Sequence, residues 1–196
     1  MTELQLLEQT FRAMTGMDEA SFALSLPYWQ LKQYKKGEFY NEYKNVCKHL
    51  GFVITGIFRT YYVNEATGEE KNMLFYTENQ IVSALKSFLT QKPCNYYTEC
   101  MVDSTILYIH INDLQQLYEK SHQWERFGRF VAEVAFNMVM DSMENAMFKT
   151  PEERYVELVK MHPNIFNTIP LYHIASYLGI QGPSLSRIRK RMQEKG

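Results

Sequence analysis

The sequence predicts an α+β protein with an N-terminal β-sandwich or barrel, a long central helix and a C-terminal pair of short helices. Short segments rich in β-branched and aromatic residues, separated by turn signals, occupy residues 28–110. Residues 122–148 then carry apolar side chains at helical spacing, and residues 169–192 contain two shorter helical patterns separated by Gly179. With 45% hydrophobic residues, the chain can bury one large core or two small ones.

The first 25 residues are expected to be helical, because apolar residues recur there at helical spacing. We expect Gly16 to end the first helix and Asp18 to cap a second one. The expected strands are residues 49–54, 57–63, 71–76, 96–102 and 105–111, and the last two are expected to pair. Residues 81–89 are predicted to form a short helix, and Asn112 or Asp113 to cap a helix through Tyr118.

The long helix predicted over residues 122–148 carries two apolar lines. The first line consists of Trp124, Phe127, Val131, Val134 and Met138, and the second contains Phe136, Val139, Met140, Met143 and Met147. A helix on the surface of a monomer needs only one such line. We therefore predict a homodimer in which the first line forms the dimer interface. A central helix buried within one chain is the alternative.

A new helix is predicted to begin at Thr150, which can cap it, with Pro151 in the first helical position and Glu153 completing a capping box. Two short helices are expected after it. Gly179 can adopt the positive φ that ends the first of them, and Pro183 suits the first turn of the second. The inward-facing residues of this last helix are predicted to be Leu185, Ile188 and Met192.

This terminal pattern is typical of a helix-turn-helix, whose second helix places small polar residues first and cations after them. Residues 171–196 contain five Lys or Arg and one acid, whereas the whole chain has a net charge of −1. We therefore predict localised contact with double-stranded DNA. The predicted DNA-binding residues are Gln181, Ser184, Ser186, Arg187, Arg189, Lys190, Arg191 and, as a phosphate contact, His173. A basic solvated helix in an ordinary bundle is the alternative.

The chain resembles the cyclic-AMP receptor/fumarate-nitrate regulator (Crp/Fnr) family of bacterial transcription factors. The resemblance rests on Lys36-Gly37-Glu38, on residues 51–59 with Thr67-Gly68-Glu69, and on residues 174–180 with 184–187. It implies a jelly-roll, cyclic-nucleotide-binding-like sensor domain (1–120), a dimerisation helix (121–149) and a helix-turn-helix DNA-binding domain (150–196). It also implies a homodimer on a near-palindromic site, with RNA polymerase and a small effector as further candidate partners.

Two departures from the family pattern matter. Cyclic-nucleotide binders of this family carry Gly-Glu and then an Arg around the phosphate, but residues 81–85 and 95–97 lack them. Since a buried cyclic phosphate would then lack its cation, we expect no binding of cyclic AMP. The residues expected around a pocket for an apolar or aromatic effector, if there is one, are Ile81, Val82, Ser83, Leu85, Tyr96 and Tyr97. Gly182-Pro183 is the second departure, and it leaves open a ligand-binding or protein-interaction module that has lost specific DNA recognition.

No residue pattern indicates catalysis, a metal site or a cofactor, so we expect no enzyme. The three cysteines, Cys47, Cys94 and Cys100, have no metal-binding spacing. We interpret Cys94 and Cys100 as buried small residues, with a redox pair as the alternative, and His49 and His110 as barrel residues. With no signal-peptide core and no membrane-length apolar run, we expect a cytoplasmic protein.

Overall fold

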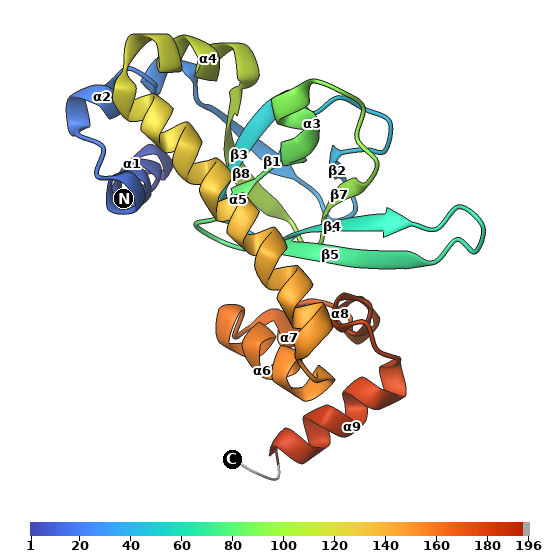
Figure 1. Cartoon of the computed structure of the whole chain (residues 1–196). Helices are drawn as coiled ribbons and strands as arrows, with labels where there is room; N and C mark the ends of the chain where they lie inside the picture. Colours follow the sequence, from blue (N-terminus) through green and yellow to red (C-terminus); the bar gives the residue numbers. More distant parts are fainter. Residues whose placement is uncertain (194–196) are drawn as a thin grey trace. The chain divides into compact units, whose positions relative to one another are not determined.

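The computed structural model describes residues 1–193, so the last three residues of the predicted C-terminal domain lie outside the described part. The helices are α1 (Glu3–Thr15), α2 (Glu19–Ala23), the 3-10 helix η1 (Leu26–Tyr28), α3 (Leu85–Thr90), α4 (Ile111–Lys120), α5 (His122–Phe148), α6 (Pro151–Met161), α7 (Ile165–Thr168), α8 (Leu171–Leu178) and α9 (Gly182–Gln193) (Figure 1). The strands are β1 (Gln30–Tyr34), β2 (Phe39–Asn41), β3 (His49–Thr55), β4 (Phe58–Val63), β5 (Glu70–Tyr76), β6 (Ile81–Val82), β7 (Tyr97–Cys100) and β8 (Ser104–His110).

The chain divides into two compact units. The first contains residues 1–59 and 75–137, and the second contains residues 60–74 together with those from 138 onward. The division therefore falls within α5 and within the hairpin formed by β4 and β5. The sequence did not indicate that the outer part of this hairpin would join the C-terminal helices.

The strands form two four-stranded sheets, in the orders β1-β8-β3-β6 and β2-β7-β4-β5. Strand β8 pairs antiparallel with both β1 and β3, and β2 pairs antiparallel with β7. Aromatic rings from the two sheets meet: the ring centroid of Tyr34 on β1 lies 5.4 Å from that of Phe58 on β4 and 6.2 Å from that of Tyr40 on β2. The inner faces of the sheets thus share one core.

Three local predictions are wrong. Strands β7 and β8 do not pair with each other, because they lie in different sheets. The predicted helix over 81–89 starts as strand β6, in which Ile81 and Val82 pair with β3, and becomes helical only at Leu85. The cap of α4 is His110, whose Nδ1 accepts a hydrogen bond from the N–H of Asn112 at 3.1 Å.

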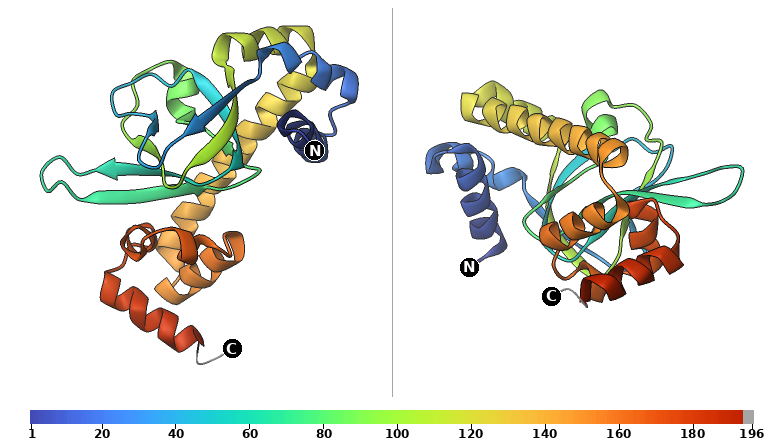
Figure 2. Two further views of the ribbon diagram at one scale, coloured as in Figure 1. Left: turned by 180° about the vertical axis from the view of Figure 1, so that it is seen from behind. Right: turned by 60° about the horizontal axis from the view of Figure 1, so that its bottom comes forward.

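An aromatic cluster joins α1 to the first half of α5, and Figure 2 shows α1 and α2 beside the start of that helix. The ring of Phe11 stacks on that of Phe127 at 4.4 Å and meets the ring of Trp124 at 6.2 Å. Trp124 and Phe127 are fully buried, and Val131 packs against the same core. The prediction that Trp124 and Phe127 lie in a dimer interface is therefore wrong, because the chain's own N-terminal helix covers them.

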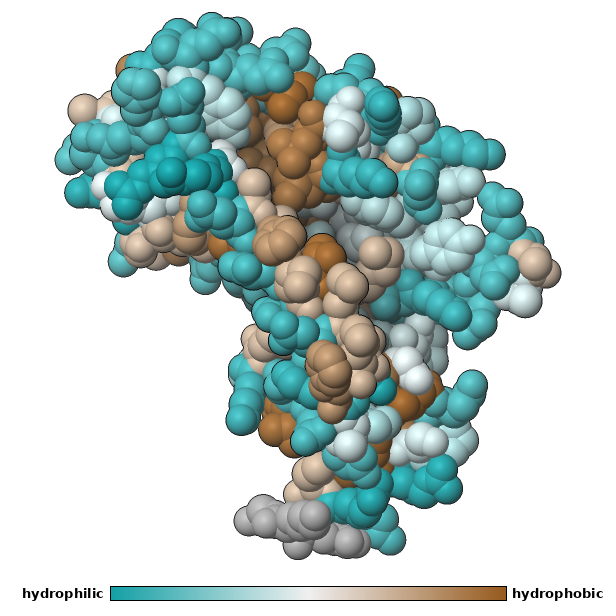
Figure 3. Space-filling view, viewed as in Figure 1, coloured by the Kyte–Doolittle hydropathy of each residue, from teal (hydrophilic) through white to brown (hydrophobic). Residues whose placement is uncertain are grey.

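The second apolar line of α5 is exposed along its whole length. The exposed fractions are 65% for Phe136, 57% for Val139, 38% for Met140, 54% for Met143 and 70% for Met147. From the predicted first line, Val134 and Met138 are also exposed, at 41% and 38%. Figure 3 shows tan and brown residues along the course of α5. A helix with this much exposed apolar surface has a face that the described residues of the chain do not cover.

In the second unit, hydrogen bonds join the outer part of β5 to α8. The Ser176 hydroxyl donates to the Glu70 carbonyl at 2.8 Å and accepts from the N–H of Asn72 at 3.1 Å. The Asn72 side-chain amide also donates to the His173 carbonyl at 3.1 Å. These bonds explain why residues 60–74 belong to the same compact unit as the C-terminal helices.

Candidate nucleic-acid interface

Helix α6 begins as expected and supports the terminal pair of helices. The Thr150 hydroxyl accepts from the N–H of Glu153, and the Glu153 carboxylate accepts from the N–H of Thr150, which completes the capping box. The hydrogen bond from the Thr150 N–H, together with one that the Thr150 hydroxyl donates at 2.9 Å, lowers the pKa of the Glu153 carboxyl. Leu158 of α6 is fully buried, as are Ile174 of α8 and Leu185 of α9.

The turn between α8 and α9 has the predicted glycine geometry. Gly179 has φ 65°, and its N–H donates to carbonyls at the end of α8. The N–H of Ile180 donates to the Ala175 carbonyl at 3.0 Å, which closes the helix end. Helix α9 then begins at Gly182 with Pro183 in its first turn, as the sequence predicts. Leu185 and Ile188 are buried and Met192 is half-buried, so α9 packs through its predicted face.

The outer face of α9 presents Ser186, Arg187 and Lys190, all exposed. The Arg187 guanidinium donates to the half-buried Ser184 hydroxyl at 3.2 Å. The Ser186 hydroxyl donates to the Gly182 carbonyl at 3.2 Å. The residues of α9 include no acid. The side chains on this face are therefore short at the start of the helix and cationic further along.

Two of the predicted cations have partners inside the unit. The Arg189 guanidinium lies over the Phe166 ring, 5.4 Å from its centroid. The Arg191 guanidinium forms an ion pair with Glu152 at the start of α6. Both partners lie far from these cations along the chain, so only the three-dimensional structure reveals them. Gln181 is exposed just before the helix begins.

His173 is not placed as predicted. Its side chain is only 5% exposed, and its Nδ1 lies 3.4 Å from the side-chain amide nitrogen of Asn72. The expected phosphate contact by the His173 side chain is therefore wrong for this arrangement, because the ring packs against β5. His173 lies in the first turn of α8, and a position on a helix does not reveal a contact with a distant strand.

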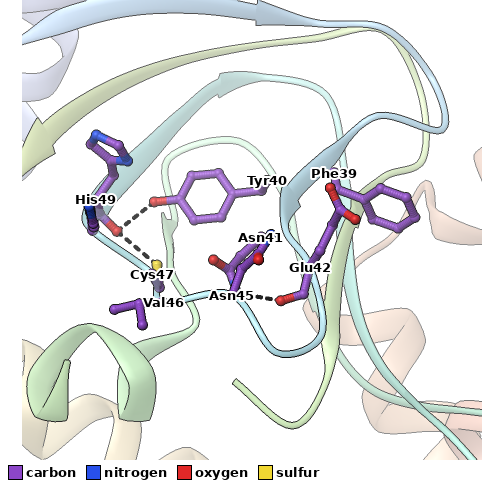
Figure 4. Close-up of a pocket in the computed structure, with 9 residues that line it drawn as sticks. Phe39, Tyr40, Asn41, Glu42, Asn45, Val46, Cys47 and His49 are labelled. Carbon is purple, nitrogen blue, oxygen red and sulfur yellow. Dashed lines mark hydrogen bonds between the residues drawn. The ribbon is translucent and has the colours of Figure 1, made fainter. Parts of the chain in front are cut away.

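A groove of about 470 Å³ lies in the first unit, along β2 and the loop that leads to β3 (Figure 4). It is lined by residues 39–42 and 45–49. The Tyr40 hydroxyl and the Cys47 thiol both donate to the His49 carbonyl, at 2.7 and 3.4 Å. None of the six residues predicted to line a ligand pocket lines this groove. Val82 and Ser83 are buried, whereas Ile81, Leu85 and Tyr96 pack against the aromatic core and Tyr97 lies near Phe39.

The cysteines are buried as single thiols. Burial raises the pKa of Cys94 and of Cys100, so both thiols are protonated near neutral pH. The Cys100 thiol also donates to the Val102 carbonyl at 2.7 Å.

Among residues 1–193, no group of three or more His, Cys, Asp or Glu is placed to hold a metal ion. No helix in that part of the chain is both long and apolar enough to cross a membrane.

Three features define the fold class. They are two sheets that share a core, a long helix, and a small helical unit that ends in two helices around a tight turn. Comparison with solved structures specifies it: the chain has the fold of Crp/Fnr-type regulators. FixK2 from Bradyrhizobium japonicum is similar with a TM-score of 0.71 and 18% identity, over 86% of each chain. A protein described as a Crp/Fnr-family transcriptional regulator, from Eubacterium rectale, has a TM-score of 0.70 and 18% identity, over 96% of this chain and 89% of that one.

CLP from Xanthomonas campestris, described as a c-di-GMP-responsive global regulator, is similar with a TM-score of 0.67 and 15% identity. That match covers 91% of this chain and 93% of CLP. No protein-family model matches the sequence, and no curated protein matches it either.

Proposed function

We propose that the protein is a homodimeric, sequence-specific DNA-binding transcription regulator. In this proposal α8 and α9 form a helix-turn-helix, and α9 enters the major groove of double-stranded DNA. The observation that carries the proposal is the acid-free outer face of α9, with Ser186, Arg187 and Lys190 exposed on it. Arg187 can contact a guanine edge, and Lys190 a phosphate.

The proposed dimer forms through α5. Its exposed row contains Phe136, Val139, Met140, Met143 and Met147. Four of these, Phe136, Met140, Met143 and Met147, follow the four- and three-residue spacing of a helix-pair seam. Burying such a row against the same row of a second copy would remove it from water. A two-fold pair of α9 helices would then match a near-palindromic DNA site.

The two-sheet domain is proposed to act as a sensor that does not use cyclic AMP. Arg59, the buried arginine of β4, pairs with the Glu99 carboxylate at 2.6 Å, and its side chain is 4% exposed. A buried cyclic phosphate needs a cation of its own, and Arg59 is already held by a carboxylate. An effector of another class would act by preferring one of two arrangements of the dimer.

The test is a fluorescence-anisotropy titration of the full chain with DNA from upstream of its own gene, against scrambled competitor and at two salt concentrations. We expect binding that resists competitor and weakens as salt rises, because phosphate contacts release counterions. Binding that is insensitive to salt, or absent for both DNAs, would instead support a ligand-binding or protein-interaction module.

A further inference from the structure

A groove of about 700 Å³ runs between the start of α6 and α9. Pro151 and Glu152 line its α6 side. The α9 side is lined by Ser184, Arg187, Ile188, Lys190 and Arg191, and Ile180 lines the groove from the preceding turn. The groove therefore begins at the edge of the outer face of α9, since Arg187 and Lys190 belong to both.

The charge of this groove is set by three cations and one acid. Arg187, Lys190 and Arg191 line it, and Glu152 is its one carboxylate among the lining residues. Glu152 and Arg191 form an ion pair, with side chains 33% and 58% exposed. An ion pair this exposed is weak and exchanges with other charged groups, so Arg191 can change partner when an anion enters.

The start of α6 itself offers little to an anion. Pro151 has no N–H, and the Glu153 carboxylate already accepts from the N–H of Thr150 at 2.7 Å. Two acids, Glu152 and Glu153, stand in the first turn. The attraction of the groove for an anion must therefore come from α9, with Glu152 opposing it.

We propose that this groove receives the sugar-phosphate backbone of a DNA strand, and that Glu152 competes with a phosphate for Arg191. This inference rests on the proposed DNA-binding function and names a residue that limits it. Because phosphates carry no sequence information, the competition lowers affinity for every DNA sequence by the same factor. Glu152 would thus weaken binding to the specific site and to all other DNA alike.

The experiment measures binding of the full chain to a fluorescein-labelled, random-sequence duplex of about 30 base pairs over a series of salt concentrations. We expect E152Q to bind several-fold more tightly than the wild type at low salt. In an R191Q background, most of this gain should disappear.

The matched control is E157Q, which makes the same charge change on α6. Glu157 pairs with Lys149 and does not line the groove. Thermal unfolding followed by circular dichroism checks that each variant is folded. The inference is overturned if E152Q matches the wild type or E157Q, or if its gain persists in full with R191Q. If the wild type shows no salt-dependent DNA binding, the proposed function itself fails, which is a different result.

Discussion

Arg187 is the side chain whose loss best separates base recognition from general attraction to DNA. It is exposed at the centre of the outer face of α9, and its guanidinium is oriented by a hydrogen bond to Ser184. If it reads a base, R187A should weaken binding to the specific site by about 1–3 kcal/mol while binding to scrambled DNA changes less. Competition anisotropy measures both. An equal loss on both DNAs would make Arg187 a phosphate contact.

His49 gives the stability of the first unit a pH dependence. Burial, followed by the charges of His110, Lys32 and Lys48, lowers the pKa of His49. The unfolded chain therefore binds a proton more readily than the folded one, and stability is lost as pH falls below the unfolded value of about 6.5. Urea unfolding at pH 7.5 and 5.5 should show a smaller loss for H49Q than for the wild type. Equal losses would contradict this assignment.

The turn from β3 to β4 depends on Gly56. Its φ is 103°, and an added Cβ would lie 1.9 Å from the Ser104 hydroxyl oxygen and 2.8 Å from the Ser104 Cα. That hydroxyl accepts from the N–H of Ile57 at 3.2 Å, so it cannot move without losing a bond. G56A should therefore destabilise the protein by about 2 kcal/mol or more, measured by urea unfolding.

Gly68, in the loop between β4 and β5, provides the control. Its φ is 70°, but an added Cβ would meet nothing within 4 Å. G68A should cost only the backbone strain of about 1–2 kcal/mol. If both variants lose the same stability, the contact with Ser104 has no energetic consequence.

The assignment of helix termini followed from local chemistry in most elements. Asp18, Thr150 and Gly179 act at helix ends as predicted, because a cap needs only residues within one turn. The cap of α4 was assigned to the wrong residue, since histidine is an uncommon acceptor at such a position. The pairing of β7 and β8 was also wrong, because strand partners lie far apart along the chain.

The exposed row of α5 predicts that the protein is a dimer. M143E would place a charge at the centre of this row, and in a dimer two such charges would face each other in an apolar seam. Sedimentation velocity should then show a monomer at concentrations where the wild type is a dimer. S142E, one position away on the helix, should leave the dimer intact. If the wild type is itself a monomer, the seam is not an interface.

The amino-acid sequence alone was enough to predict the order of the β-rich region, the long helix and the terminal helices, together with the extent of α5, the capping of α6 and the glycine turn before α9. Each depends on hydrophobic periodicity or on contacts within a few residues, which the order of side chains specifies directly. The inward face of α9 was predictable for the same reason.

Three features could be read only from the folded chain: Trp124 and Phe127 of α5 are buried while apolar residues in the second half of that helix are exposed, two cations of α9 have partners, and His173 packs against β5. Each of these depends on a segment that is distant in sequence: α1 covers Trp124 and Phe127, Glu152 holds Arg191, and Asn72 contacts His173. The sequence pattern of an apolar line or of a run of cations is the same whether or not a distant segment covers it. The pattern alone therefore does not show which side chains are buried or paired.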